Sequence, residues 1–206
     1  MNQTTIREST KIRYLGVLLD SKLSWKFHNA ELCKKLSRAI GMLYQMRNLC
    51  QKETLKSIYY SLLHFHLIYG ISVWGLASVS LTNKIFQLQK KAVRIVSKSD
   101  YLAHTNPLFK ELKILKCPDQ YLHNLSGMMW DYDHDKIPKS LNNWFHKTNH
   151  LYRTRFATRG KLQPCVYSTK KFGIHSFRYE GTHVLNILKD TILYTNSNSK
   201  KKIMKI

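Results

Sequence analysis

Residues 32–46 read Leu-Cys-Lys-Lys-Leu-Ser-Arg-Ala-Ile-Gly-Met-Leu-Tyr-Gln-Met, and this stretch decides the fold class. Its apolar side chains recur every three or four positions, which is the period of an amphipathic helix. Basic side chains lie mostly between them, so the helix has one basic flank. Ser24 is a suitable N-cap and is expected to begin the helix. The apolar positions are Leu32, Leu36, Ala39, Ile40, Leu43 and Met46, and the basic ones are Lys34, Lys35, Arg38 and Arg47.

Two more long helices are predicted after the first. Residues 53–73 are apolar around most of a helical circumference, which marks this segment as the buried centre of a bundle, and Gly70 is expected to bend or end it. Residues 81–96 are apolar on one side and only basic on the other. Shorter helices are expected over 107–115, 118–129 and 138–146.

The two ends of the chain carry the strand signals. Residues 12–19 are a short apolar run that stops at a turn-like triplet, and they are interpreted as one buried strand. Few residues precede it, so this strand is expected to lack a partner and to be the remnant of a sheet. A small hairpin is predicted within 166–179, followed by a helix over 182–193.

The expected fold is therefore mainly α, a helical bundle with an N-terminal strand remnant and a small C-terminal β-hairpin region. Five parts are expected along the chain: 1–23 as a strand remnant, 24–100 as a helical domain, 101–149 as short helices, 150–195 as the hairpin and helix, and 196–206 as a frayed basic tail.

The charge of the chain indicates a polyanionic partner. Lys and Arg number 34 against 12 Asp and Glu, which gives a formal net charge of +22. The hydrophobic share of 43% excludes a disordered basic tail. The polar face that holds Lys90, Lys91, Arg94 and Lys98 contains no acid, whereas an ordinary solvated face mixes both signs. A phosphate backbone would supply the missing charges, so nucleic acid is favoured over a merely solvated basic surface.

The chain shows no local motif of an enzyme. Asp131, Asp133 and Asp135 resemble the start of a calcium loop, but the sixth position is Lys136 rather than Gly and the twelfth is Asn142 rather than Glu. A structural role is favoured for these carboxylates. Nucleophile elbows and glycine-rich phosphate loops are absent from the sequence.

Histidine, cysteine and hydropathy patterns are equally plain. His64 and His66 lie two residues apart, so on a helix they occupy different faces and are interpreted as packing or surface residues. The four cysteines are too widely spaced for a zinc site and are interpreted as reduced structural thiols. Neither a signal peptide nor a membrane span is predicted, which favours a soluble intracellular protein.

Several short motifs resemble those of one family. Residues 14–20, Tyr-Leu-Gly-Val-Leu-Leu-Asp, with Leu-Ser-Trp at 23–25, resemble the stretch of non-LTR (LINE-type, jockey-like) retrotransposon reverse transcriptases that follows the catalytic palm motifs. Residues 69–75 resemble the family's Y-G-x-x-x-W-G element, and 88–95 its L-Q-K-x-A-x-R-I helix. With similar short motifs at 112–115 and 176–179, the resemblance covers about residues 11–195.

The resemblance implies a role for each part. It implies that residues 12–20 are a primer-grip strand at the edge of the palm, with Tyr14, Leu15 and Gly16 as primer-grip-like residues, and that residues 24–100 are a helical thumb. In that family the thumb holds the template–primer duplex, so the basic residues become candidates for phosphate contacts. Together with Lys98 from the charge argument, these candidates are Lys34, Lys35, Arg38, Lys90, Lys91 and Arg94.

The chain also departs from the family. Polymerisation of this type needs two Mg²⁺ ions held by carboxylates that include an Asp-Asp pair, and this chain has no Asp-Asp. The fingers and the catalytic palm would lie before residue 11. The sequence therefore predicts no enzyme and no cofactor, but a truncated, non-catalytic polymerase fragment that binds nucleic acid. Two alternatives stay open: a non-functional fragment of a mobile element, or a basic helical adaptor that binds an acidic protein.

Overall fold

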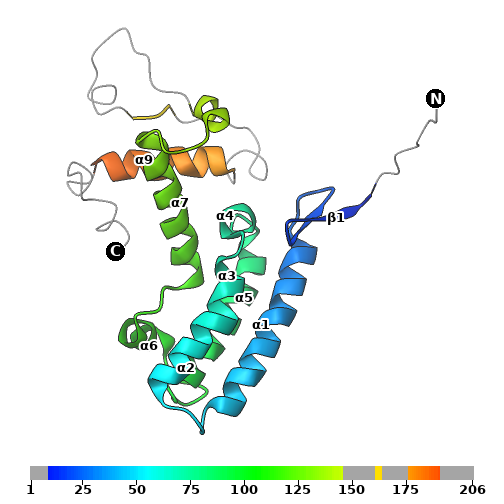
Figure 1. Cartoon of the computed structure of the whole chain (residues 1–206), viewed down its shortest axis with the longest axis vertical. Coiled ribbons are helices and arrows are strands. Elements are labelled where there is room, and N and C mark those ends of the chain that lie inside the picture. The colour runs from blue at the N-terminus through cyan, green and yellow to red at the C-terminus, as the bar shows by residue number, and fades with distance from the viewer. Residues whose placement is uncertain (1–8, 146–160, 164–175, 191–206) are drawn as a thin grey trace. The chain divides into compact units, whose positions relative to one another are not determined.

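The computed structural model describes residues 9–145, 161–163 and 176–190, and the chain divides into two compact units, Met1–Pro118 and Asp119–Ile206. The mainly α fold is confirmed (Figure 1). The five-part division of the chain stays a prediction. Unit 1 contains the strands β1 (Lys11–Tyr14) and β2 (Val17–Asp20) and the helices α1 (Lys26–Met46), α2 (Lys52–Tyr59), η1 (Tyr60–His64), α3 (Phe65–Ile68), α4 (Ile71–Trp74), α5 (Val79–Val96) and α6 (Thr105–Leu112).

The N-terminal run of strand-forming residues folds as a hairpin, so the expectation of one buried strand without a partner is wrong. β1 pairs antiparallel with β2, so that Lys11 lies opposite Asp20 and Tyr14 opposite Val17. The chain reverses at Leu15 and Gly16, whose φ angles of 44° and 79° are the left-handed values that a type I′ hairpin turn requires. β1 is exposed along its length and β2 is half-buried.

Helix α1 packs along α5, and this pair forms one side of the core of unit 1. The apolar spacing found in the sequence is the buried stripe, because Leu32, Leu36, Ala39 and Leu43 are all at most 5% exposed. Ser24 does not cap the helix, which begins after Trp25. Its hydroxyl and backbone N–H instead donate to the carboxylate of Asp20, so Ser24 fastens the end of the hairpin.

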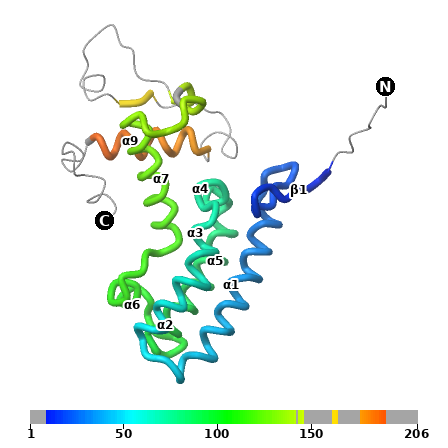
Figure 2. Tube along the Cα trace, in the orientation of Figure 1, coloured from blue at the N-terminus to red at the C-terminus, as the bar shows by residue number. Residues whose placement is uncertain are grey.

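The predicted central helix is a broken one. A π-helical segment, η1, separates α2 from α3, and Gly70 ends α3 with a φ of +64°. Its inner face is fully buried, whereas Phe65, Tyr69 and Val73 are about half exposed, so the segment is not buried all round. In Figure 2, α1 turns back into α2 at the end of the unit away from the hairpin. The buried inner face consists of Leu55, Tyr59, Leu63, Leu67, Ile71 and Trp74.

Unit 2 takes in most of α7 (Cys117–Asp133), the 3₁₀ turn η2 (Lys139–Trp144) and α9 (Phe177–Asp190). Asp133, from the acidic cluster, forms an ion pair of 2.6 Å with Lys189. The predicted C-terminal hairpin lies mostly outside the described residues. Its last positions, Phe177 and Tyr179, are helical, so α9 begins five residues earlier than the expected Thr182.

We expect Gly181→Ala to destabilise unit 2, although alanine favours a helix over glycine by about 1 kcal/mol. A β-carbon at this position would lie 2.7 Å from Sδ of the fully buried Met129 and 3.4 Å from the ring of Phe145. Overpacking of this kind costs about 1–3 kcal/mol. Thermal unfolding followed by circular dichroism measures the change. Gly41→Ala is the control, because open space surrounds its β-carbon and the variant should gain about 1 kcal/mol.

Candidate nucleic-acid interface

Four of the predicted phosphate-binding residues lie exposed on the α1–α5 pair. Lys34 and Arg38 are four residues apart, so they share one face of α1, and that face points away from the buried stripe. Lys91 is exposed on α5, and Lys98 follows the end of that helix with a left-handed φ of 57°. Within the described ranges none of the four forms an ion pair. Their charges are therefore available to an external anion.

The other three predicted cations already have partners. Lys35 forms an ion pair of 3.2 Å with Glu31. Nζ of Lys90 lies 4.5 Å from the centroid of the Phe86 ring, which is a cation–π contact. Nε of Arg94 donates a 2.9 Å hydrogen bond to the carbonyl of Ala103. These contacts hold the three side chains in place. We therefore consider them weaker candidates for phosphate binding than the four exposed cations.

A groove of about 450 Å³ lies between the C-terminal halves of α1 and α5, and no motif in the sequence predicted it. Its lining includes the cations Arg47, Lys91 and Arg94, the tyrosines Tyr44 and Tyr101, and no carboxylate. Arg47 donates from Nη2 to the carbonyl of Ser99 at 3.0 Å. Arg47 had appeared in the sequence only as a basic flank of α1. Its role depends on the loop after α5, which no helical period can locate.

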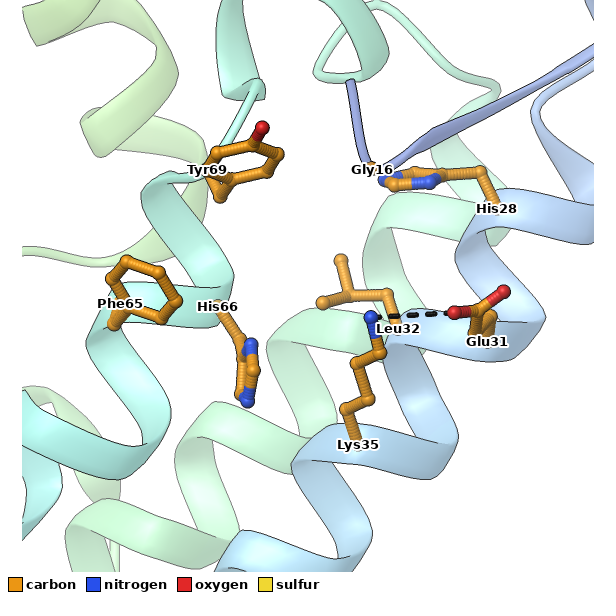
Figure 3. A pocket seen from close by; sticks show the side chains of 8 residues that line it. All are labelled: Gly16, His28, Glu31, Leu32, Lys35, Phe65, His66 and Tyr69. Carbon is orange, nitrogen blue, oxygen red and sulfur yellow. Dashed lines mark ion pairs between the residues drawn. The ribbon is translucent and has the colours of Figure 1, made fainter. Parts of the chain in front are cut away.

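The primer-grip-like residues meet the break between α3 and α4. The hydroxyl of Tyr69 donates to the carbonyl of Leu15, and a β-carbon on Gly16 would lie 3.3 Å from the Tyr69 ring. Tyr14 is 64% exposed. A pocket of about 160 Å³ lies between the turn, α1 and α3, lined among others by His28, Lys35 and His66 (Figure 3). The hairpin turn is thus joined to the helices through Tyr69.

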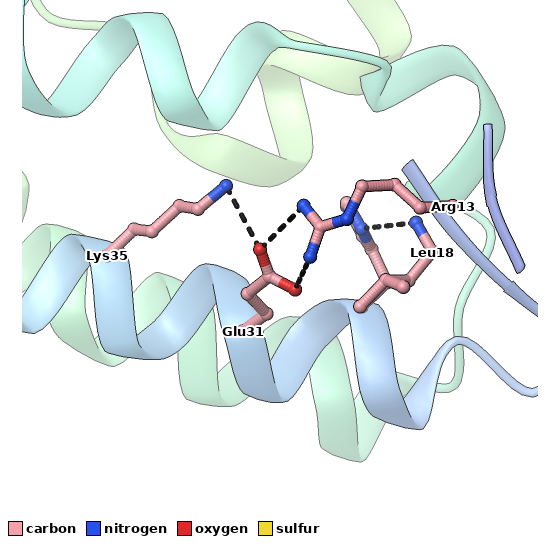
Figure 4. Close-up of polar contacts among 5 residues, drawn as sticks. Arg13, Leu18, Glu31 and Lys35 are labelled. Carbon is pink, nitrogen blue, oxygen red and sulfur yellow. Dashed lines mark hydrogen bonds and ion pairs between the residues drawn. The ribbon is translucent and has the colours of Figure 1, made fainter. Parts of the chain in front are cut away.

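An ionic cluster beside this pocket ties β1 to α1 (Figure 4). Arg13 reaches Glu31 with both terminal nitrogens, at 3.0 Å and 2.8 Å, and Lys35 contacts the same carboxylate. The hydrogen bonds from Arg13 are the main reason that the pKa of Glu31 lies below its ordinary value. The cluster is solvent-exposed, so it orients the hairpin more than it stabilises the fold.

His28 on α1 contacts strand β2 of the hairpin, and this contact depends on the protonation state of the imidazole. The backbone N–H of Leu18 donates to Nδ1 of His28 at 3.3 Å, so this nitrogen must be unprotonated. The ring lies between Trp25 and Trp74, with centroid distances of 6.5 Å and 6.0 Å. Burial is the largest cause that lowers the pKa of His28; Lys35 and Arg13 lower it further, and Glu31 raises it.

We therefore expect unit 1 to lose stability in mild acid. Because the pKa of His28 is lower in the fold than its unfolded value of about 6.5, its contribution is complete above that pH. It is lost as the pH falls through the lowered pKa. Urea unfolding at pH 7.5 and pH 5.5 measures the difference. His64 and His66 act in the same direction, so His28→Gln should reduce the pH dependence without abolishing it. An unchanged dependence in this variant would count against the Leu18 contact.

The described residues contain no cluster of side chains that could hold the Mg²⁺ ions used by the family that the motifs resemble. Three or more His, Cys, Asp or Glu side chains do not come together anywhere in the described residues. The same residues contain no helix with the length and apolarity needed to cross a bilayer.

Comparison with curated proteins finds relatives in mobile elements. The chain is 32% identical over 130 residues to the RNA-directed DNA polymerase from mobile element jockey of Drosophila melanogaster, which covers 61% of this chain and 14% of the relative. It is 24% identical over 145 residues to the probable RNA-directed DNA polymerase from transposon X-element, which covers 69% of this chain and 15% of that relative. The corresponding protein from transposon BS is 25% identical over 122 residues.

This chain is a relative of the RNA-directed DNA polymerases of non-LTR retrotransposons. The resemblance seen in the sequence motifs is thereby confirmed. The chain spans about one seventh of the length of the curated proteins that it matches. No protein-family model and no solved structure matches it.

The expectation that the protein is not an enzyme is wrong. It rested on the missing Asp-Asp pair, but the relatives are named as enzymes and the matched stretch is only about 14% of each. The matches do not cover a catalytic palm. The absence of an Asp-Asp pair from such a short share of a polymerase therefore carries no weight against catalysis.

Proposed function

We propose that unit 1 of this chain acts as the thumb of an RNA-directed DNA polymerase and holds a template–primer duplex by contacts to its phosphates. The observation that carries the proposal is the set of exposed cations on α1 and α5 that have no acidic partner among the described residues. A duplex presents about one negative charge per 1.7 Å of its axis, and lysine and arginine neutralise such charges by releasing counterions. The relatives' names supply the kind of nucleic acid, because copying RNA into DNA produces an RNA–DNA duplex.

The fold supports this role by placing the cations on a rigid frame. Lys34 and Arg38 lie on α1 and Lys91 lies on α5, and these two helices share the core of unit 1. The polymerase reaction itself, with its Mg²⁺ ions and carboxylates, is part of the same proposal for the protein. None of its steps is assigned to the described residues, whose contribution is the grip on the duplex.

The test is a salt titration of duplex binding. The full chain is titrated into a fluorescently labelled RNA–DNA duplex, and anisotropy gives the association constant at several salt concentrations. If the four exposed cations each neutralise one phosphate, the logarithm of the constant falls with the logarithm of salt with a slope of about −3 to −4. A flat salt dependence, or no binding at low salt, contradicts the proposal.

Two alternatives give other outcomes. An adaptor for an acidic protein would be displaced from the duplex by polyglutamate at an equal charge concentration, whereas a duplex-binding surface resists this competitor. A non-functional fragment would unfold without a cooperative transition. The paired hairpin and the buried core of unit 1 favour a cooperative one.

A further inference from the structure

The groove between α1 and α5 combines features that the exposed cations alone do not explain. Its volume of about 450 Å³ lies within the range of pockets that hold small organic ligands. Arg47, Lys91 and Arg94 line it together with two tyrosines and no acid. Tyr44 is 62% exposed and Tyr101 is 72% exposed, so large aromatic surfaces face solvent beside positive charge. A phosphate contact needs the cations but has no use for the rings.

We infer that this groove takes an unpaired nucleotide of a single strand, stacking its base on Tyr44 or Tyr101 and placing its phosphate against Lys91. The inference rests on the proposed function and adds the state of the nucleic acid at this position. In a duplex every base is already stacked between its neighbours, so an aromatic side chain gains a base as a partner only where the strand is unpaired. A basic groove with exposed aromatic side chains is the usual arrangement for single-strand binding.

The walls of the groove are held in place by contacts of its arginines. Arg47 donates to the carbonyl of Ser99, and Arg94 donates to the carbonyl of Ala103. These bonds fix both ends of the loop that carries Tyr101. Each guanidinium has five N–H donors, so both arginines keep donors for a phosphate after these bonds are made. Lys91 has no ion pair within the part of the chain that the structure describes, and it supplies the free charge.

The floor of the groove leaves room for a flat base. Ser37 and Gly41 line it from α1, and, apart from the chain neighbours and the backbone of its own helix, no heavy atom lies within 4 Å of a β-carbon placed on Gly41. Ile40 and Ile95 add apolar surface, which suits the faces of a base and not a hydrated ion. The groove therefore offers an apolar slot with a cationic side, which matches the two halves of a nucleotide.

The experiment compares three labelled ligands with the full chain: a blunt RNA–DNA duplex, the same duplex with a single-stranded overhang, and the overhang sequence alone. We expect the overhang to increase duplex affinity. The double variant Tyr44→Ala/Tyr101→Ala should lose this increase and bind the single strand at least tenfold more weakly, with an unchanged salt slope. Tyr44→Phe/Tyr101→Phe should retain it, because phenylalanine still stacks. Leu102→Ala is the control, because this side chain is 86% exposed beside Tyr101 and does not line the groove.

The outcomes separate this inference from the proposed function. If blunt and overhang duplexes bind equally well, or if the alanine variant keeps its affinity for the single strand, the inference is overturned while duplex binding stands. If a mononucleotide at equal nucleotide concentration displaces the overhang, the inference that the groove binds a nucleotide within a single strand is overturned. Binding of none of the three ligands overturns both proposals.

Discussion

Replacing Gln89 with leucine is expected to lower the free energy of unfolding of unit 1 by about 3 kcal/mol or more. Gln89 is 1% exposed and joins three segments of the chain. Its Nε2 donates to the hydroxyl of Tyr59 at 3.0 Å and to the carbonyl of Leu115 at 2.9 Å. Its Oε1 accepts a 2.7 Å hydrogen bond from the backbone N–H of Cys117. Leucine would leave these buried groups without partners, at about 1–3 kcal/mol each.

Two variants serve as controls for Gln89→Leu. Gln87→Leu makes the same change on the exposed side of α5 and should stay within about 0.5 kcal/mol of the wild type. Tyr59→Phe removes one of the three hydrogen bonds and should cost about 1 kcal/mol. Urea unfolding of the full chain, followed by circular dichroism, gives all three values. Equal stability of the two leucine variants would show that the Gln89 contacts do not hold α5 to the segment before α7.

The second large effect is expected in nucleic-acid binding. The triple variant Lys34→Ala/Arg38→Ala/Lys91→Ala removes three exposed cations of the α1–α5 pair that lack an ion-pair partner among the described residues. Each phosphate contact contributes about 0.9 to the salt slope, so the slope should become shallower by about 3. At low salt the affinity for an RNA–DNA duplex should fall on the order of 10²-fold. Anisotropy titrations across salt concentrations measure both quantities.

A matched control removes the same charge elsewhere in unit 1. Lys52→Ala/Lys56→Ala/Lys110→Ala takes three lysines from α2 and α6, outside the α1–α5 pair. One of them, Lys52, already forms an ion pair of 3.1 Å with Glu111. If binding depends only on total charge, the two triple variants weaken it equally. If the α1–α5 pair is the interface, the control keeps most of the wild-type slope.

Helical period was a sufficient guide to the two helices that carry most of the candidate cations. In α1 and α5 most of the apolar positions at three- and four-residue spacing are buried, because a helix can bury only one stripe against its neighbours. The prediction for the central segment was less accurate. Tyr60, Phe65 and Tyr69 are apolar or aromatic but lie on its outer side, so composition alone overstated its burial.

The hairpin shows where local patterns were insufficient. Residues 12–19 form a continuous run of strand formers, and only Gly16 signals a turn within it. Leu15 also takes a left-handed φ, which a leucine rarely adopts. The contact of Tyr69 with the Leu15 carbonyl accompanies this turn, 54 residues away in sequence. A tertiary contact of this kind leaves no trace in the period of the strand.

The prediction for the start of the C-terminal helix was wrong for a related reason. Aromatic residues near Phe177 indicated a strand, yet they begin α9. The ring of Phe177 lies 6.0 Å from that of Phe145 and at a steep angle to it, and Phe145 also packs against Tyr132. Aromatic side chains suit either a strand or a helix end, and here Phe177 begins a helix and packs against Phe145.

The sequence by itself determined the helical class, the excess of positive charge and the relationship to retrotransposon polymerases, because composition, period and short motifs are local properties. It also named the seven candidate cations, which differ little in sequence. Only the tertiary structure separated them. Lys35, Lys90 and Arg94 find a carboxylate, a ring and a carbonyl, whereas Lys34, Arg38, Lys91 and Lys98 stay exposed. Glu31 and Phe86 lie one helical turn from Lys35 and Lys90, and the loop after α5 brings Ala103 to Arg94. A cation's availability depends on which of the possible neighbours its side chain contacts in the folded protein, and helical period does not specify those contacts.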